Sequence, residues 1–154
     1  MKEPRNKVIL WHKGRVKILI NKKLGNDFEH ELCEILADAG YWVHNFANRK
    51  NGQPADIIAV KNIKSYLIDA KVCSYEVFPF RRIEDNQHLA MDMWLECGNT
   101  TPYFALKCRN EIYMVSYATI KDLMRKGKKQ LNFEDMNKYG TRLATWLRLT
   151  DRIG

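Results

Sequence analysis

Two apolar segments, residues 55–60 and 65–72, lie on either side of a four-residue connection, and this arrangement constrains the fold more than any other part of the sequence. Short segments rich in Ile, Val, Leu and Ala, bounded by polar turns, are typical of β-strands. If the connection closes an antiparallel hairpin, Val60 lies opposite Ser65, and every other pairing follows from that register.

The same register gathers charged side chains on one patch. It pairs Asp56 with Asp69 across the strands, and Lys71 shares a face with Asp69 because side chains two residues apart on a strand point the same way. The apolar residues between them are expected on the opposite, buried face: Ile68, Ala70 and Val72. Two like charges at close range repel, and a hard divalent cation such as Mg²⁺ would reverse that effect because it prefers oxygen ligands.

This combination suits phosphodiester hydrolysis. A bound metal can activate and orient a water, and the ammonium group of Lys71 can stabilise the extra negative charge of a pentavalent transition state. Each residue also has a structural interpretation: Asp69 and Lys71 could form a surface ion pair, and Asp56 could be a turn residue after Gln53-Pro54. The set as a whole, embedded in apolar strands, favours a site.

Glu29 adds a third carboxylate. Apolar residues recur at helical spacing after Gly25 and predict a helix that ends at Gly40; they are Phe28, Leu32, Ile35, Leu36 and Ala39. Glu29 lies at the edge of this buried face, from where it can reach the rim of a sheet. Its spacing of three from Asn26 also fits a capping box, which is the structural alternative.

The remaining pattern predicts a mixed α/β (α+β) fold with a central mixed sheet flanked by helices. Further strands are expected at 41–46, 103–108 and 111–116, and helices at 83–97 and from a Thr119 cap to 126. Residues 143–149 could be a strand or a helix, and residues 130–154 have no assigned role. We expect a single domain over residues 25–154, preceded by a basic arm or hairpin over residues 1–24.

The charge of +8 is concentrated at one end of the chain. Residues 1–24 hold eight basic residues and one acid, whereas residues 25–154 are close to neutral. A basic arm on a near-neutral body is typical of nucleic-acid binding, although a solubilising surface would look similar. No segment has the length and apolarity of a membrane helix or a secretory signal, so a cytosolic location is the default expectation.

The layout resembles the PD-(D/E)xK nuclease superfamily, and within it the RecU-type and archaeal Hjc-type Holliday junction resolvases. The resemblance covers residues 25–116 and rests on Gly25-x-x-Phe28-Glu29, Gly40-Tyr41-x-Val43, Pro54-x-Asp56-Ile57-Ile58-Ala59, Ile68-Asp69-x-Lys71, Phe78-Pro79-Phe80 and Ile83-x-x-x-Gln87. It implies a restriction-endonuclease-like core. The segment 46–54 is too short for the stalk insertion of RecU proteins, so the chain is more similar to a compact archaeal or phage-encoded form.

The resemblance also implies residue roles. Glu29, Asp56 and Asp69 would bind Mg²⁺, for which Mn²⁺ would substitute. Lys71 would be the catalytic lysine, and Gln87 would help to place the phosphate or the water. Asp69 stands where the family often has the longer Glu.

The implied function is a Mg²⁺-dependent, structure-selective endonuclease that resolves four-way DNA junctions as a homodimer in a bacterial, archaeal or phage-infected cell. Its DNA contacts would come from Lys13, Arg15, Lys17, Lys22, Lys23, His44, Arg81 and Arg82. Tyr75, Phe78 and Phe80 are candidates for a dimer interface or for ordinary packing. The alternatives are a related nuclease of restriction or repair type and a non-catalytic DNA-binding module.

Overall fold

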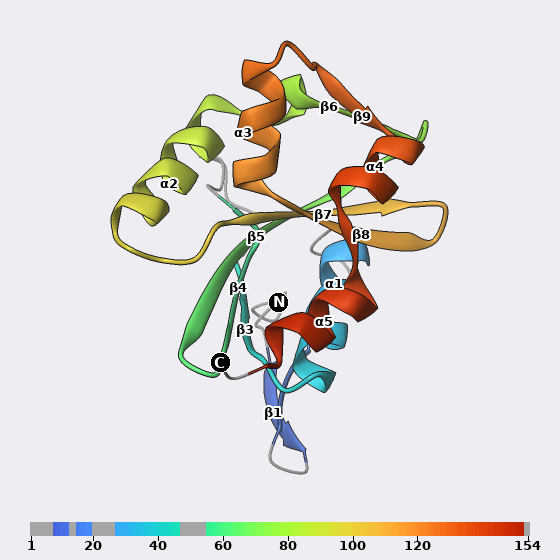
Figure 1. Ribbon diagram of the computed structural model, residues 1–154. Helices are drawn as coiled ribbons and strands as arrows, with labels where there is room; N and C mark the ends of the chain where they lie inside the picture. Colours follow the sequence, from blue (N-terminus) through green and yellow to red (C-terminus); the bar gives the residue numbers. More distant parts are fainter. Residues whose placement is uncertain (1–7, 13–14, 20–26, 47–54, 153–154) are drawn as a thin grey trace, which may run out of the picture.

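The computed structural model describes residues 8–12, 15–19, 27–46 and 55–152, with side chains described from residue 27 onward. Its centre is a six-stranded mixed sheet in the order β10-β8-β7-β5-β4-β3 (Figure 1). These strands are β3 (Trp42–Asn45), β4 (Ile57–Lys61), β5 (Lys64–Val72), β7 (Tyr103–Cys108), β8 (Glu111–Ser116) and β10 (Thr141–Arg142). The predicted mixed sheet flanked by helices is confirmed.

Helices cover both faces of the sheet. They are α1 (Asp27–Asp38), α2 (Asp85–Glu96), α3 (Tyr117–Arg125), α4 (Phe133–Tyr139), α5 (Leu143–Thr150) and the short 3-10 helix η2 (Phe80–Arg82). Residues of α1 and α5 pack into one hydrophobic cluster with one face of the sheet. Residues of α2, α3 and α4 pack into a second cluster against the other face (Figure 1).

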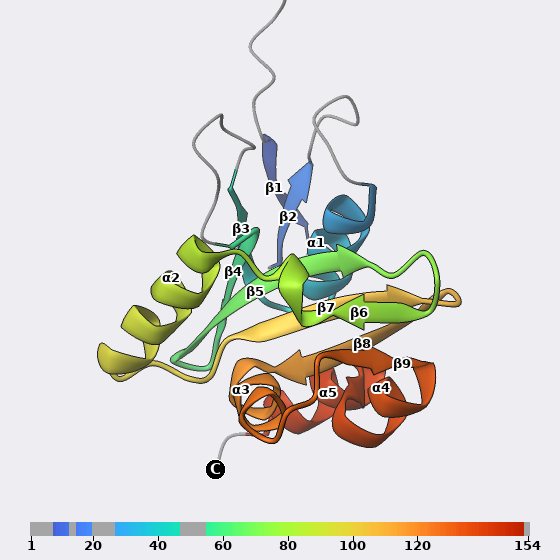
Figure 2. The ribbon, with the colours of Figure 1, turned by 90° about the horizontal axis from the view of Figure 1, so that it is seen from above.

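Two small strand pairs complete the described structure. Strands β1 (Val8–His12) and β2 (Arg15–Leu19) pair antiparallel, and so do β6 (Val77–Pro79) and β9 (Gln130–Asn132). Figure 2 shows the β1–β2 pair beside α1, away from the helices of the second cluster. The predicted boundary between arm and domain, at residues 24 and 25, lies outside the described residues.

Among the described strands of the central sheet, β5 and β7 form the one parallel pair, and this pairing explains the place of α2. Parallel neighbours need a long crossover, usually a helix, whereas antiparallel neighbours can be joined by a tight turn. The chain therefore leaves β5, passes through β6, η2 and α2, and returns as β7. This crossover carries Gln87 back across the sheet towards the strand that carries Asp69.

Local signals set most of the helix ends. Helix α1 ends at Asp38, and Gly40 follows it with a φ of +95°, a conformation that a residue with a side chain rarely adopts. The predicted cap of α3 at Thr119 is wrong: the Ser116 side chain accepts a hydrogen bond from the Thr119 backbone N–H, and the helix begins at Tyr117. Ser116 is also the last residue of β8, so the strand passes directly into the helix.

Residues from the C-terminal part of the chain are buried in both hydrophobic clusters. Leu131 and Met136 are fully buried in the second cluster. Trp146 of α5 lies in the first cluster, with its ring centroid 6.0 Å from Tyr41 and 5.1 Å from Tyr66. Residues 143–149, which the sequence left open between strand and helix, are helical because Leu143 and Trp146 lie one turn apart and face the sheet together.

Replacing Trp146 by alanine should destabilise the protein by about 3–5 kcal/mol, because it removes a large buried ring and leaves a cavity. Leu149 lies on the same helix and is 53% exposed, so Leu149→Ala should change stability by no more than about 0.5 kcal/mol. Urea denaturation monitored by circular dichroism measures both variants. Equal effects would contradict the packing of α5 on the sheet.

Candidate active site

The β4–β5 hairpin brings two carboxylates together at its open end. Val60 pairs with Ser65 and Ile57 pairs with Ile68, which confirms the predicted register. Asp56 lies one residue before the ladder, and its backbone N–H donates to the carbonyl of Ile68 at 3.1 Å. Its side chain continues the pairing, since Oδ2 accepts a hydrogen bond from the Ala70 N–H at 2.8 Å.

Asp69 is the buried centre of the cluster, with only 1% of the residue exposed. Lys71 Nζ lies 3.0 Å from its Oδ2, which confirms that the two side chains share a face. Oδ1 accepts a hydrogen bond from Gln87 Nε2 at 2.9 Å. Both carboxylate oxygens are thus held by positively polarised groups, one from the same strand and one from α2.

Gln87 is positioned by the start of its own helix. Glu84 is the N-cap of α2 and forms a capping box with Gln87. The Gln87 side-chain oxygen accepts from the Glu84 backbone N–H at 3.1 Å, so its amide nitrogen is left facing Asp69. The side chain is 5% exposed, which excludes the alternative of a solvated polar residue on an amphipathic helix.

One part of the strand prediction is wrong. Ile68 and Ala70 are buried on the opposite face of the sheet, as expected, but Val72 is 39% exposed. Val72 is the last residue of β5, where its carbonyl accepts a hydrogen bond from Arg82. The buried face of β5 therefore ends before the strand does.

Glu29 reaches the cluster from α1, on the other face of the sheet. The pKa of Glu29 is raised from 4.5 to about 7, first by burial and then by the charge of Asp56. A hydrogen bond with Asn45 and the charge of Lys71 oppose the rise. The structural alternative for Glu29, a capping box with Asn26, involves a residue outside the described ones.

The pKa of Asp69 is raised from 3.8 to about 8, again first by burial and second by the charge of Asp56. Lys71 lowers it, through its charge and a hydrogen bond. Burial disfavours the charged form of a carboxyl group, and a neighbouring carboxylate does the same. Negative charge on Glu29 and on Asp69 is therefore destabilised in this cluster.

Sequence reasoning missed Asn45. This residue is 5% exposed, hydrogen-bonds Glu29, and donates to the sulfur of Cys33 at 3.6 Å. The signal was present, because Asn45 alternates with the apolar Val43 on β3 and so belongs to the buried face. A polar side chain on a buried face needs a hydrogen-bond partner, and Glu29 supplies it.

The predicted DNA-binding residues do not all gather at this cluster. Lys13, Lys22 and Lys23 lie outside the described residues, and Arg15 and Lys17 lie on β2, whose side chains are not described. His44 lies on β3. Arg82 donates to the Val72 carbonyl at 2.9 Å.

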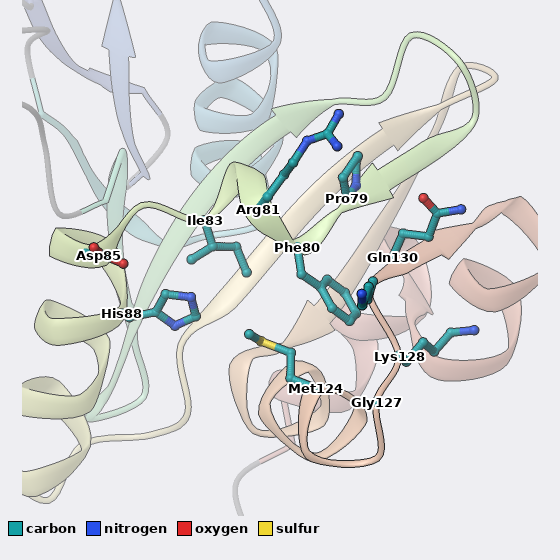
Figure 3. Close-up of a pocket in the computed structure, with 11 residues that line it drawn as sticks. Pro79, Phe80, Arg81, Ile83, Asp85, His88, Met124, Gly127, Lys128 and Gln130 are labelled. Atoms are coloured by element: carbon teal, nitrogen blue, oxygen red, sulfur yellow. The ribbon is translucent and has the colours of Figure 1, made fainter.

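Arg81 lies at a separate cavity of about 670 Å³ between η2, α2 and the end of α3. Figure 3 shows its side chain extending away from the inner wall, which Phe80, Ile83, His88 and Met124 form. Polar and charged side chains, among them Asp85 and Lys128, complete the lining. Arg81 therefore belongs to this mixed cavity rather than to the carboxylate cluster.

Two of the three aromatic candidates for a dimer interface are core residues. Phe78 and Phe80 are 0% and 4% exposed and belong to the second cluster. Tyr75 is 91% exposed. The packing alternative therefore holds for both phenylalanines.

The chemistry of the cluster fits a hard divalent cation. Asp69 Oδ2 is buried with the Lys71 ammonium 3.0 Å away. Burial and the charge of Asp56 raise the pKa values of Glu29 and Asp69, and a cation would stabilise their charged forms. Among the residues that the structure describes, no three His, Cys, Asp or Glu side chains form a ready-made metal cage. Mg²⁺ does not require one, because it is usually bound by one or two carboxylates together with waters and substrate phosphates.

The fold is that of a known nuclease. Hjc, a Holliday junction resolvase from the archaeal hyperthermophile Archaeoglobus fulgidus, superimposes with a TM-score of 0.62 at 21% identity. The match covers 80% of this chain and 99% of Hjc. Among curated proteins the comparison finds no significant match.

The family follows from the sequence itself. The family model of RecU, described as Recombination protein U, matches residues 45–150. The chain belongs to the RecU family, which confirms the resemblance to junction-resolving nucleases. The match includes Asp56, Asp69, Lys71 and Gln87, whereas Glu29 lies before it. No helix among the described residues has the length and apolar character needed to cross a membrane.

The raised pKa values predict that the metal-free protein loses stability as the pH rises. Glu29 and Asp69 keep their protons to about pH 7 and 8 when folded, but lose them near 4.5 and 3.8 when unfolded. The folded state therefore binds more protons across this window, and stability falls with pH through it. Urea midpoints measured in chelator should fall between about pH 5 and pH 8, and Asp69→Asn should flatten that fall.

Asp92→Asn is the matched control. The pKa of Asp92 is lowered, chiefly by its hydrogen bond with Lys121, so its contribution to stability is complete above its unfolded value and is lost only towards acid. A pH slope in Asp69→Asn identical to that of the wild type would contradict the burial of charge at this site.

Proposed function

We propose that this chain is a Mg²⁺-dependent endonuclease that cuts four-way DNA junctions by phosphodiester hydrolysis, in recombination or repair. The observation that carries the proposal is the convergence of Glu29, Asp56 and Asp69 beside Lys71 in a chain of the RecU family. Several carboxylates gathered in a buried site destabilise the folded protein. A cation bound between them would offset this cost and could also contact a substrate phosphate.

Glu29, Asp56 and Asp69 would hold the cation, and Mn²⁺ would replace Mg²⁺. When bound, the cation would supply positive charge to the phosphate oxygens and lower the pKa of a nearby water. The Lys71 ammonium lies on the same face as Asp69 and would stabilise the charge that develops on the phosphorus oxygens.

The remaining contacts would act by keeping these groups in place. The Ala70 N–H fixes the Asp56 carboxylate, and the capping box of α2 aims the Gln87 amide at Asp69. Gln87 is therefore a positioning residue in this proposal. Preorganised groups need not rearrange during the reaction, which is the main source of electrostatic catalysis.

Junction binding would use phosphate contacts and a two-fold dimer. Arg81, Arg82 and the basic residues of the N-terminal segment would contact phosphates, which makes the affinity salt-dependent and largely independent of sequence. Two strands of a four-way junction must be cut, and a homodimer would supply two equivalent sites.

Asp69→Asn should reduce junction cleavage in Mg²⁺ by about 100-fold or more, because the variant loses a charged cation ligand and keeps its shape. The assay uses a labelled four-way junction, with a flap and a linear duplex at equal salt. Asp92→Asn is the control and should cleave as the wild type does. Equal cleavage by Asp69→Asn would contradict the proposed site, and preferential cutting of the flap or the linear duplex would identify a nuclease for another substrate.

Lys71→Ala should abolish cleavage while leaving junction affinity, measured by fluorescence anisotropy without metal, within about threefold of the wild type. Removing one preorganised charge from a transition state costs about 100- to 1,000-fold in rate. A parallel loss of affinity would assign Lys71 to DNA anchoring instead of catalysis.

A further inference from the structure

Three rings form a row along β3, the edge strand of the central sheet. The ring centroids of Trp42 and His44 lie 6.1 Å apart with an interplanar angle of 10°, and those of His44 and Phe46 lie 5.1 Å apart at 82°. Trp42 is 45% exposed. Trp42 and His44 project to the same side of the sheet because they lie two residues apart on β3. Phe46 lies just after the end of the strand, and its ring contacts that of His44.

The pairing register shows which face this is. His44 pairs with Ile58, and Ile58 pairs with Leu67. Leu67 and Asp69 lie two residues apart on β5, so the rings and the Asp69 carboxylate occupy one face. Figure 2 shows β3 and β4 side by side next to β5.

The row is continuous with the carboxylate cluster. At its end, the Phe46 backbone N–H donates to the carbonyl of Asp56 at 2.8 Å, and Asp56 is the neighbour of Asp69. From Phe46 the row continues to His44 and then to Trp42, which pairs with Val60 of β4. A strand of DNA whose phosphate lies at the carboxylates would therefore have its next nucleotides beside the rings.

We propose that Trp42, His44 and Phe46 form a stacking surface for unpaired bases of the DNA strand that enters the carboxylate cluster. This inference rests on the proposed nuclease function and adds to it the state of the DNA that is bound. The chain carries a net charge of +8, which favours a polyanion as the occupant over a neutral or basic peptide.

An aromatic surface of this kind favours unpaired bases. Successive bases in one strand of a duplex lie about 3.4 Å apart along the axis and are stacked on one another, so both faces of each base are covered. Only a base that has left this stack can place a face on an exposed ring such as that of Trp42, which is 45% exposed. Aromatic side chains bind such bases with little regard to sequence, because every base has a π face.

The test measures binding, not cleavage. Wild type and Trp42→Ala are titrated in chelator against a labelled oligo-dT strand, a duplex and a four-way junction, with fluorescence anisotropy as the readout. Trp42→Ala should weaken binding of oligo-dT by about 5- to 50-fold and binding of the duplex by less than about twofold. The dependence of log affinity on log salt should not change, because no phosphate contact is removed. Trp42→Phe should restore most of the affinity.

Tyr75→Ala is the matched control, since Tyr75 is an aromatic residue with 91% exposure beside a different cavity, near Arg109 and Phe133. It should bind all three DNAs as the wild type does. Unchanged oligo-dT affinity in Trp42→Ala, or an equal loss for oligo-dT and duplex, would overturn the inference while leaving the nuclease proposal intact. A wild type that binds none of the three DNAs would instead overturn the nuclease proposal together with the inference.

Discussion

The burial of Asp69 is the constraint on which the site depends. A carboxylate removed from water is costly unless it is paired and hydrogen-bonded. Here Lys71 approaches one oxygen and Gln87 donates to the other, while Asp56 places a second negative charge nearby. These contacts do not offset the cost of burial fully, because the pKa of Asp69 is still raised to about 8. In the proposed function, a cation would supply the remaining stabilisation of the carboxylate.

The site forms where the two faces of the sheet meet. Glu29 comes from α1, which packs in the first cluster, and Gln87 comes from α2 on the opposite face. Asp56 joins them because it lies just beyond the end of the β4 ladder, where its side chain replaces a backbone partner of β5. A loss of packing on either face would therefore disturb the same few atoms.

The hairpin and its acidic pair could be predicted from the sequence because a four-residue connection fixes the register locally. The place of Gln87 required the family resemblance, since its contact with Asp69 depends on a helix that crosses the sheet. The sequence left open whether Phe78 and Phe80 pack in the core or lie at an interface, because their partner Leu131 lies about fifty residues further along the chain. The role of Asn45 was missed, although its alternation with Val43 predicts that it is buried. The role of a buried polar residue depends on its hydrogen-bond partner, and the partner here, Glu29, lies on a different element.

The central position of β5 has a consequence for how this enzyme could diversify. Asp69 and Lys71 lie on β5, where they pair with Phe104 and Leu106 of β7. Between them the Ala70 N–H donates to the Asp56 side chain, so the backbone at these residues cannot move without disturbing both contacts. Glu29 and Gln87 lie on helices, which tolerate small shifts of packing more readily. Sequence changes that shift α1 or α2 against the sheet would therefore move Glu29 or Gln87 relative to Asp69 without displacing β5.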